Sequence, residues 1–170
     1  MATPQAASYW IDHLKLEPHS EGGHFREVYR SAAQIGECCL GGDRGGSRSV
    51  STAIYYLLSG AEFSAFHRIR SDEIWHHYAG GSLTVHVIDS AGSYRALGLG
   101  LDLEAGQSPQ VMVSAGSWFG ATVDDLSSYC LVGCTVAPGF DFRDFELADR
   151  AALVGLYPQH RGIIERLTMG

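Results

Sequence analysis

From residue 50 onward, the chain consists of short runs rich in β-branched and aromatic residues, and turn residues separate these runs at close intervals. The runs cover residues 50–58, 63–69, 73–78, 82–88, 94–97, 110–113 and 128–136. Ser59-Gly60, Ser71-Asp72 and Gly80-Gly81 are typical of the turns between them. Strands at this spacing, without long helices between them, predict an all-β sandwich or barrel.

Helical spacing of apolar residues is found only near the two ends of the chain. We expect an N-terminal helix and strand over about 4–30, and two short helices over about 147–167. Residues 32–49 are rich in glycine and have no periodicity, which predicts a long loop. No repeat or linker is evident, so we expect one domain over 1–170, with its barrel at about 50–146.

Composition excludes several classes of partner. The 170 residues carry a net charge of -7 and form no cluster of Lys and Arg, so we expect no nucleic acid and no anionic membrane as partner. No basic region followed by an apolar run opens the sequence, which favours a cytoplasmic protein. Cys130 and Cys134 lie four apart in a predicted strand, roughly 13 Å from each other, so they are not expected to form a disulfide.

Residues 66–81 hold the densest group of chemically active side chains. Alternate side chains of an extended strand share a face, so Glu73, Trp75 and His77 are expected on one face and His76 on the other. If Glu73 points into the barrel, Trp75 and His77 line the same interior. Each histidine taken alone is at least as often a surface residue as a functional one, but the cluster as a whole favours a ligand pocket.

His67 belongs to the preceding run, and a tight turn at Ser71-Asp72 is expected to bring it across from Glu73. A neutral imidazole beside a carboxylate suits two kinds of chemistry. It binds divalent metals, or it acts as a general base whose ring the carboxylate orients. The residues alone leave both alternatives open.

The same segment resembles the first cupin motif, with His67 at the first histidine position, Glu73 at the carboxylate and Gly80 seven residues later. The second histidine position is Ile69. The second cupin motif is echoed in residues 114–119, where Phe119 stands at the histidine position. Two of the four usual metal ligands are therefore absent, so the cofactor stays unassigned, with a divalent metal as one alternative.

A closer resemblance extends over nearly the whole chain. The phrases at 21–27, 51–58, 66–76, 116–121 and 132–140, in that order, resemble the cupin family 5 group, also called DUF985. The resemblance implies a cupin double-stranded β-helix, a jelly-roll barrel similar in fold to the sugar-nucleotide epimerases of the rhamnose pathway. It also implies a homodimer, for which the segment 24–30 is a candidate to cross between subunits, and it makes His76 as much a candidate as His77. The family's activity is largely undefined.

We therefore consider three functions for a small-molecule pocket. The first is an epimerase or isomerase acting on a carbohydrate or nucleotide-sugar, in which His67 is the base, Glu73 orients it, and Tyr55, Tyr78 or Tyr129 supplies the acid. The second is a metal enzyme with His67, Glu73 and His77 as ligands. The third is a non-catalytic binder, so whether the protein is an enzyme stays open. The candidate ligand-binding residues are Trp75, His76, His77, Trp118, Phe119 and Arg26.

Overall fold

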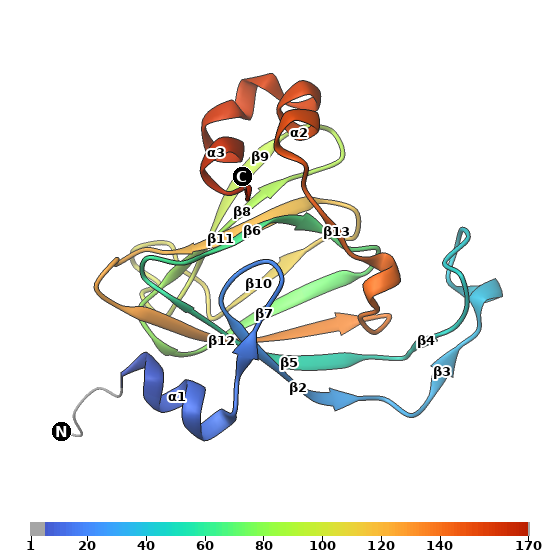
Figure 1. The fold of residues 1–170 in the computed structure, drawn as a ribbon, viewed down its shortest axis with the longest axis horizontal. Helices are drawn as coiled ribbons and strands as arrows, with labels where there is room; N and C mark the ends of the chain where they lie inside the picture. Colours follow the sequence, from blue (N-terminus) through green and yellow to red (C-terminus); the bar gives the residue numbers. More distant parts are fainter. Residues whose placement is uncertain (1–5, 170) are drawn as a thin grey trace.

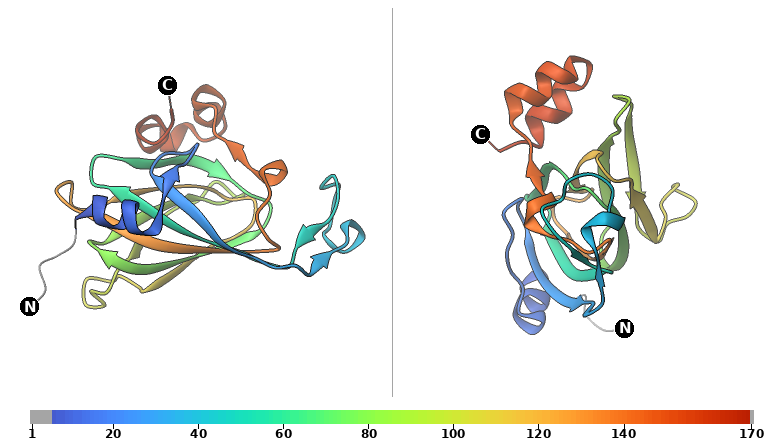
Figure 2. Two further views of the ribbon diagram at one scale, coloured as in Figure 1. Left: turned by 60° about the horizontal axis from the view of Figure 1, so that its bottom comes forward. Right: turned by 90° about the vertical axis from the view of Figure 1, so that its right-hand side faces the viewer.

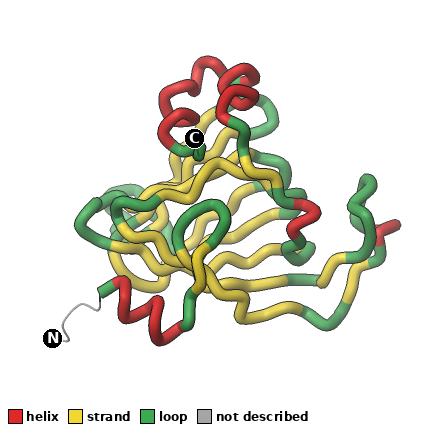
Figure 3. The backbone as a smooth tube through the Cα atoms, viewed as in Figure 1, coloured by secondary structure: helices red, strands yellow, loops and turns green. Residues whose placement is uncertain are grey.

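The computed structural model describes residues 6–169, in which a six-stranded and a five-stranded antiparallel sheet pack face to face (Figures 1 and 3). The first sheet has the order β1 (Glu17–Pro18), β2 (His24–Arg30), β5 (Thr52–Ser59), β12 (Tyr129–Ala137), β7 (Asp72–Gly80) and β10 (Gln110–Val113). The second has the order β13 (Glu146–Leu147), β6 (Phe63–Arg68), β11 (Trp118–Val123), β8 (Leu83–Ile88) and β9 (Tyr94–Leu99). The predicted all-β class is confirmed.

The core lies between the two sheets, and side chains at alternate positions of the strands point into it. Tyr56 and Leu58 of β5 point inward from the first sheet, and Val85 and Val87 of β8 meet them from the second. These side chains are almost completely removed from water, and burial of apolar surface is the main force that holds the sheets together.

Strand β11 was not among the predicted strands, which is an error with a clear physical cause. Its outer face is covered by the C-terminal helices and its inner face by the core, so nearly every side chain is buried. A strand buried on both faces shows no polar alternation. Gly120-Ala121 in the middle further lowers its apparent strand propensity.

Helices cover the outer face of each sheet. Helix α1 (Ala7–Leu14) packs on the first sheet through an apolar cluster with Leu57 and Leu131. Helices α2 (Arg150–Leu156) and α3 (Arg161–Arg166), joined by the 3-10 turn η3 (Pro158–His160), pack on the second. The predicted start of the C-terminal helices at 147 is wrong, because Leu147 pairs with His67 in the sheet and Asp149 caps α2. The first residues of the predicted N-terminal segment lie outside the described part of the chain.

The predicted glycine-rich loop contains an arm that projects from the sandwich (Figure 2). Two short strands, β3 (Gln34–Ile35) and β4 (Arg48–Ser49), pair with each other, and the 3-10 turn η1 (Glu37–Cys39) lies between them. The expectation of a structureless loop is therefore wrong for its two ends. Within residues 6–169, no helix is both long enough and apolar enough to cross a bilayer.

Candidate functional site

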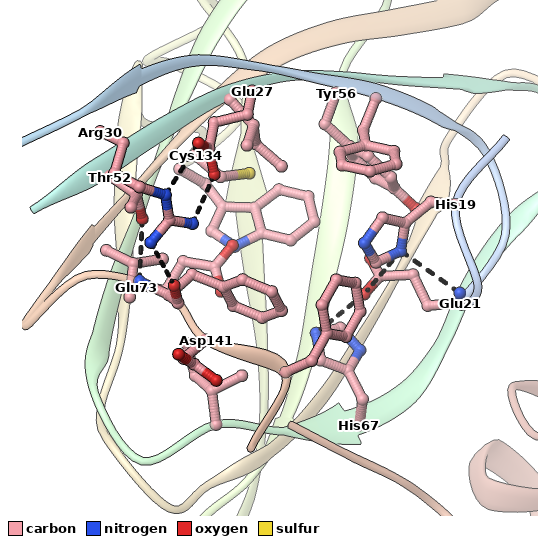
Figure 4. A pocket seen from close by; sticks show the side chains of 17 residues that line it. His19, Glu21, Glu27, Arg30, Thr52, Tyr56, His67, Glu73, Cys134 and Asp141 are labelled. Atoms are coloured by element: carbon pink, nitrogen blue, oxygen red, sulfur yellow. Dashed lines mark hydrogen bonds and ion pairs between the residues drawn. The ribbon is translucent and has the colours of Figure 1, made fainter. Parts of the chain in front are cut away.

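A cavity of about 280 Å³ opens between the two sheets (Figure 4). Its walls come from four strands of the first sheet, from β6 of the second, from the loop between β1 and β2, and from the chain around the 3-10 turn η2 (Phe142–Asp144). The lining residues with polar or charged side chains are His19, Glu21, Glu27, Arg30, Thr52, Tyr56, His67, Glu73, Trp75, Cys134 and Asp141.

His67 and Glu73 both line this cavity, but from opposite sheets. The carboxylate that contacts His67 is Glu21, whose Oε2 lies 3.2 Å from Nε2 of the ring. Nδ1 of His67 lies 2.8 Å from the carbonyl oxygen of Ala65. The prediction that Glu73 orients the His67 ring is therefore wrong, because β6 and β7 diverge into different sheets after the turn that joins them.

A bulge in β6 explains why two of its residues reach Glu21. The register against β11 shifts between Phe119, which pairs with His67, and Ala121, which pairs with Ser64. The extra residue changes the phase of the strand, so Ser64 and His67 face the same side. The Ser64 hydroxyl donates to Oε1 of Glu21 at 2.7 Å.

The loop that carries Glu21 lies directly against β6. The backbone N–H of Ala65 donates to the Glu21 carbonyl at 2.8 Å. Gly22 follows with φ of +110°, and a Cβ there would lie 2.2 Å from the carbonyl oxygen of Phe63. Only glycine allows both the left-handed backbone and this close approach. The Gly22-Gly23 pair thus places the Glu21 carboxylate in the cavity.

His19 shares the Glu21 carboxylate with His67. Its Nδ1 lies 3.5 Å from Oε2 of Glu21 and 3.3 Å from the Glu21 backbone nitrogen. The ring contacts Phe25 edge-on, with centroids 4.4 Å apart. Burial lowers the pKa of His19, and the negative charge of Glu21 opposes this only in part. His19 is therefore neutral at pH 7.

Glu73 is buried and keeps its proton at neutral pH. Removal from water raises the pKa of its carboxyl to about 8, and the negative charge of Glu21 contributes in the same direction. Cys134 lies beside it, and burial followed by the charge of Glu73 raises the pKa of that thiol well above its usual value. The cavity thus presents a protonated carboxylic acid, which can donate a hydrogen bond or a proton.

A second bulge brings an ion pair to the cavity wall. The register of β2 against β5 shifts between Glu27 and Tyr29, so Glu27 and Arg30 face the same side although they are three residues apart. Arg30 donates to both carboxylate oxygens of Glu27, at 2.9 and 2.6 Å. Arg30 is the only arginine among the described residues that line the cavity, and it already has a carboxylate partner.

Of the other predicted site residues, Trp75 lines the cavity and Phe119 lies behind it against the His67 ring, at 4.1 Å between centroids. Nε1 of Trp75 is buried and has no hydrogen-bond partner among the described residues. This N–H group is therefore available to a ligand that enters the cavity.

The remaining candidates lie outside the cavity. Tyr55, Tyr78 and His76 are on the outer face of the first sheet, where Tyr78 contacts Tyr55 edge-on and stacks with His76. His76 contacts Thr135 and Gln110, which agrees with the alternation that places it opposite Glu73. The tyrosines therefore cannot serve as the acid for a ligand in the cavity.

Three further candidates have structural contacts elsewhere. Arg26 donates to the carbonyl of Leu14 at the end of α1. Trp118 packs against the C-terminal helices and under the guanidinium of Arg68, 4.5 Å from the ring centroid. Tyr129 accepts a hydrogen bond from Trp10 at 2.7 Å. Each of the three side chains thus has a structural contact that requires no ligand.

The predicted metal ligands do not fit a metal site. His77 is not among the residues that line the cavity, and its Nε2 lies 3.1 Å from the carbonyl of Gly81. Ile69 and Phe119, at the usual ligand positions, have no donor atoms. Within residues 6–169, no group of three His, Cys, Asp or Glu side chains has an arrangement that holds a metal ion.

Five lining residues were not predicted from the sequence: His19, Glu21, Glu27, Arg30 and Asp141. The signal for Glu21 was present, since Glu-Gly-Gly-His was among the phrases that carried the resemblance. Glu27 and Arg30 carried no signal, because strict alternation places residues three apart on opposite faces and a bulge is not visible in the sequence.

Comparison with known proteins agrees with this architecture. The family model Cupin_5, described as "Cupin superfamily (DUF985)", matches residues 8–148. The solved structure of protein SO0799 from Shewanella oneidensis is 41% identical with a TM-score of 0.87, covering 97% of this chain and 98% of that one. A hypothetical protein from Leishmania major is 38% identical with a TM-score of 0.89, covering 98% and 100%.

A curated relative, the uncharacterized protein YML079W of Saccharomyces cerevisiae, is 28% identical over 150 residues, which are 83% of this chain and 74% of that protein. The expected cupin double-stranded β-helix is confirmed. The family match covers most of the chain, from α1 to the residue after β13. The chain belongs to the DUF985 family of the cupin superfamily.

Proposed function

We propose that this protein is a sugar isomerase or epimerase that transfers protons to and from a small polyhydroxylated carbonyl compound. The observation that carries the proposal is the arrangement of titratable groups on opposite walls of one cavity. Glu73 on the first sheet holds a proton at neutral pH, and the His19, Glu21 and His67 cluster faces it from the loop and the second sheet. Two groups of unlike protonation state are what acid–base catalysis requires.

The reaction needs no further reactant. A basic group of the cluster takes the proton from the carbon beside the carbonyl, and the electron pair of the broken C–H bond forms the double bond of an enol. The carbonyl oxygen receives the proton of the Glu73 carboxyl, which becomes a carboxylate. Return of the two protons at exchanged positions restores both groups and gives the isomer.

Charge and size favour a free sugar over a nucleotide-sugar. Glu21, Glu27 and Asp141 surround the cavity, while Arg30 is occupied by Glu27. A diphosphate would thus meet carboxylates, and no arginine or lysine without a partner lies among the described lining residues. A cavity of about 280 Å³ suits one sugar ring. Trp75 supplies both an apolar face and a free N–H donor, a pairing suited to a polyhydroxylated ring.

The test is proton exchange with solvent. Purified protein is incubated in deuterated water with a panel of unphosphorylated aldoses and ketoses and of nucleoside-diphosphate sugars, and loss of the C–H signal is followed by NMR. We expect exchange with free sugars, loss of it in Glu73→Gln, and unchanged exchange in Glu146→Gln, whose carboxylate is exposed. Binding of a sugar without exchange would support the non-catalytic binder instead, and stoichiometric metal in untagged protein would support the metal enzyme.

We also propose that the protein is a homodimer. Ile74, Tyr78 and Met112 are exposed on the outer face of the first sheet, where Met112 pairs directly with Ile74. A patch of large apolar side chains on a sheet face supports an interface. β2 pairs with β5 of the same chain, so the association proposed here involves the sheet face and not exchange of this strand. A monomer mass independent of concentration in sedimentation equilibrium would contradict it.

A further inference from the structure

The indole N–H of Trp75 is a buried donor without a partner. Its Nε1 atom has almost no exposed surface and makes no hydrogen bond to another residue in the described part of the chain. The ring is fixed edge-on by Tyr56 and Phe119, with centroids at 5.7 and 6.4 Å. A buried donor that makes no hydrogen bond destabilises the folded state, and native proteins contain few of them. The position of this N–H therefore calls for an acceptor that forms when the protein is at work.

Glu73 carries the strongest acceptor among the neighbours of Trp75 on the sheet. The two residues lie two apart on the same face of β7, and both side chains line the cavity. Across the sheet, Trp75 pairs with Val111 of β10 and with Cys134 of β12. A valine side chain offers no acceptor and a thiol only a weak one, whereas an ionised carboxylate accepts strongly.

The indole N–H faces the Glu73 carboxyl without being bonded to it. Burial, followed by the charge of Glu21, raises the pKa of Glu73 to about 8. Donors on Cys134 and Trp75 act in the opposite direction and lower this pKa. A donor lowers the pKa of a carboxyl by stabilising the carboxylate form. The N–H thus lies within reach of Glu73, although the geometry is not that of a hydrogen bond.

We infer that Trp75 is a positioning residue for Glu73, and that its indole N–H forms a hydrogen bond to the Glu73 carboxylate once the acid has given up its proton. In the proposed reaction the O–H bond of Glu73 breaks and the proton passes to the carbonyl oxygen of the substrate. The electron pair stays on Glu73, whose carboxylate then accepts the N–H. Return of the proton frees the N–H again. The catalytic part of this inference rests on the proposed function, whereas the hydrogen bond itself does not.

The timing of this bond gives it an effect on rate. While Glu73 holds its proton, the N–H is free to meet an oxygen of a bound ligand. A charged acceptor forms a hydrogen bond roughly twice as strong as a neutral one, so the N–H turns to Glu73 as the negative charge develops. Stabilisation that is present in the transition state and absent from the ground state raises kcat and leaves KM unchanged.

Other titratable groups share the cavity with Glu73, so their effect on it must be separated from that of Trp75. They are the cluster of His19, Glu21 and His67 on the opposite wall, Tyr56 of β5, Cys134 of β12, the Glu27–Arg30 pair of β2 and Asp141 beside η2 (Figure 4). Replacement of the Trp75 side chain removes none of these groups. A change in the titration of Glu73 that depends on the indole N–H alone therefore reports the proposed bond.

The first test needs no substrate. Proton–nitrogen NMR of the full chain observes the indole N–H groups of the three tryptophans while pH is raised from 6 to 10. We expect the Trp75 indole proton to move downfield as Glu73 ionises, and that of Trp118, which packs against the C-terminal helices, to stay in place. The movement should be absent in Glu73→Gln. A Trp75 proton that does not move, or that moves equally in Glu73→Gln, would overturn the inference.

The second test removes the N–H and keeps the ring. Trp75 is replaced site-specifically by benzothienylalanine, whose bicyclic ring has a sulfur atom in place of the N–H, and Trp75→Phe is a second variant. Each should raise the pKa of Glu73 by about one unit or more, because a hydrogen bond to a charged group is lost. Carbon NMR of the Glu73 carboxyl measures the titration.

A packing defect gives a different result from a lost hydrogen bond. Water admitted beside a loosened ring would lower the pKa of Glu73, since hydration favours the carboxylate. Trp118→Phe is the matched control, because it removes a buried indole outside the cavity and should leave the titration unchanged. Thermal unfolding verifies that each variant is folded. An unchanged or lowered pKa in the benzothiophene variant would show that the N–H does not stabilise the carboxylate.

The third test uses the sugar that exchanges protons in the panel. The benzothiophene variant should lower kcat by about tenfold or more with KM unchanged. If it exchanges as fast as the unaltered protein, the bond has no catalytic effect, and the proposed function stands. If the unaltered protein exchanges no sugar, the proposed function fails and the catalytic role of Trp75 fails with it. The first two tests then decide the hydrogen bond to ionised Glu73 by themselves.

Discussion

Asp144 accepts hydrogen bonds from the buried guanidinium of Arg48 with both carboxylate oxygens, each at 2.8 Å. Arg48 also donates to the carbonyls of Gly46, Ser47 and Arg44. This pair therefore joins the glycine-rich arm to the turn η2, whose neighbouring residues form one wall of the cavity. The Arg48–Asp144 ion pair thus holds the base of the arm against η2.

Removal of this carboxylate should destabilise the protein strongly. Asp144→Ala leaves Arg48 as a buried charge without its partner, a change that typically costs about 3–5 kcal/mol. Glu146→Ala is the matched control, because its ion pair with Arg68 is exposed and worth about 1 kcal/mol or less. Urea unfolding of the two variants measures both values. Equal losses would show that the Arg48 pair contributes no more than a surface ion pair.

Glu73 should make stability depend on pH. Its folded pKa, about 8, lies above the unfolded value near 4.5, so the folded state binds the proton more tightly. The contribution of Glu73 to the free energy of unfolding is fully present below pH 4.5. It is lost as pH rises to 8, at a slope of roughly 1.4 kcal/mol per pH unit. Glu73→Gln lacks this titration. Unfolding free energies measured from pH 5 to pH 8 should fall more steeply in the unaltered protein than in the variant.

Gly120 should not tolerate a side chain. A Cβ at this position would lie 2.6 Å from the carbonyl oxygen of Ser64 and 3.2 Å from the nitrogen of Phe66, both backbone atoms of β6. Gly120→Ala must therefore push β11 away from the bulge that carries His67, and we expect a loss of about 2 kcal/mol or more. Gly155 is the opposite case, because it lies in helix α2 and a Cβ there would meet open space. Gly155→Ala should therefore stabilise the folded protein by about 0.5–1 kcal/mol. Thermal melts distinguish the two.

The four cysteines should divide into two reactive and two inert thiols. Cys38 and Cys39 are exposed in the arm, whereas Cys130 and Cys134 are buried in β12. Burial raises the pKa of Cys130 to about 12, so almost no thiolate forms there at pH 8. Mass spectrometry after treatment of folded protein with iodoacetamide should find label on Cys38 and Cys39. Cys134 lines the cavity, so rapid label on it without denaturant would contradict the raised pKa of its thiol.

Local periodicity predicted much of the fold. Turn residues and β-branched runs marked most strands of both sheets, and alternation correctly separated Glu73 and Trp75 from His76 and Tyr78. These features depend only on the two-residue repeat of an extended strand, which neighbouring residues establish by themselves. β11 was not predicted, because burial on both faces removes that repeat from its sequence.

The partners of each functional group depend on the tertiary structure. The sequence by itself determined that His67 and Glu73 belong to neighbouring strands of an all-β chain. It did not determine that these strands enter opposite sheets, or that Glu21 reaches His67 from a distant loop. Bulges in β2 and β6 place Arg30 and Ser64 at the site, and a bulge is selected by pairing with a distant strand. Contacts between remote segments are set by register and packing, which no local pattern encodes.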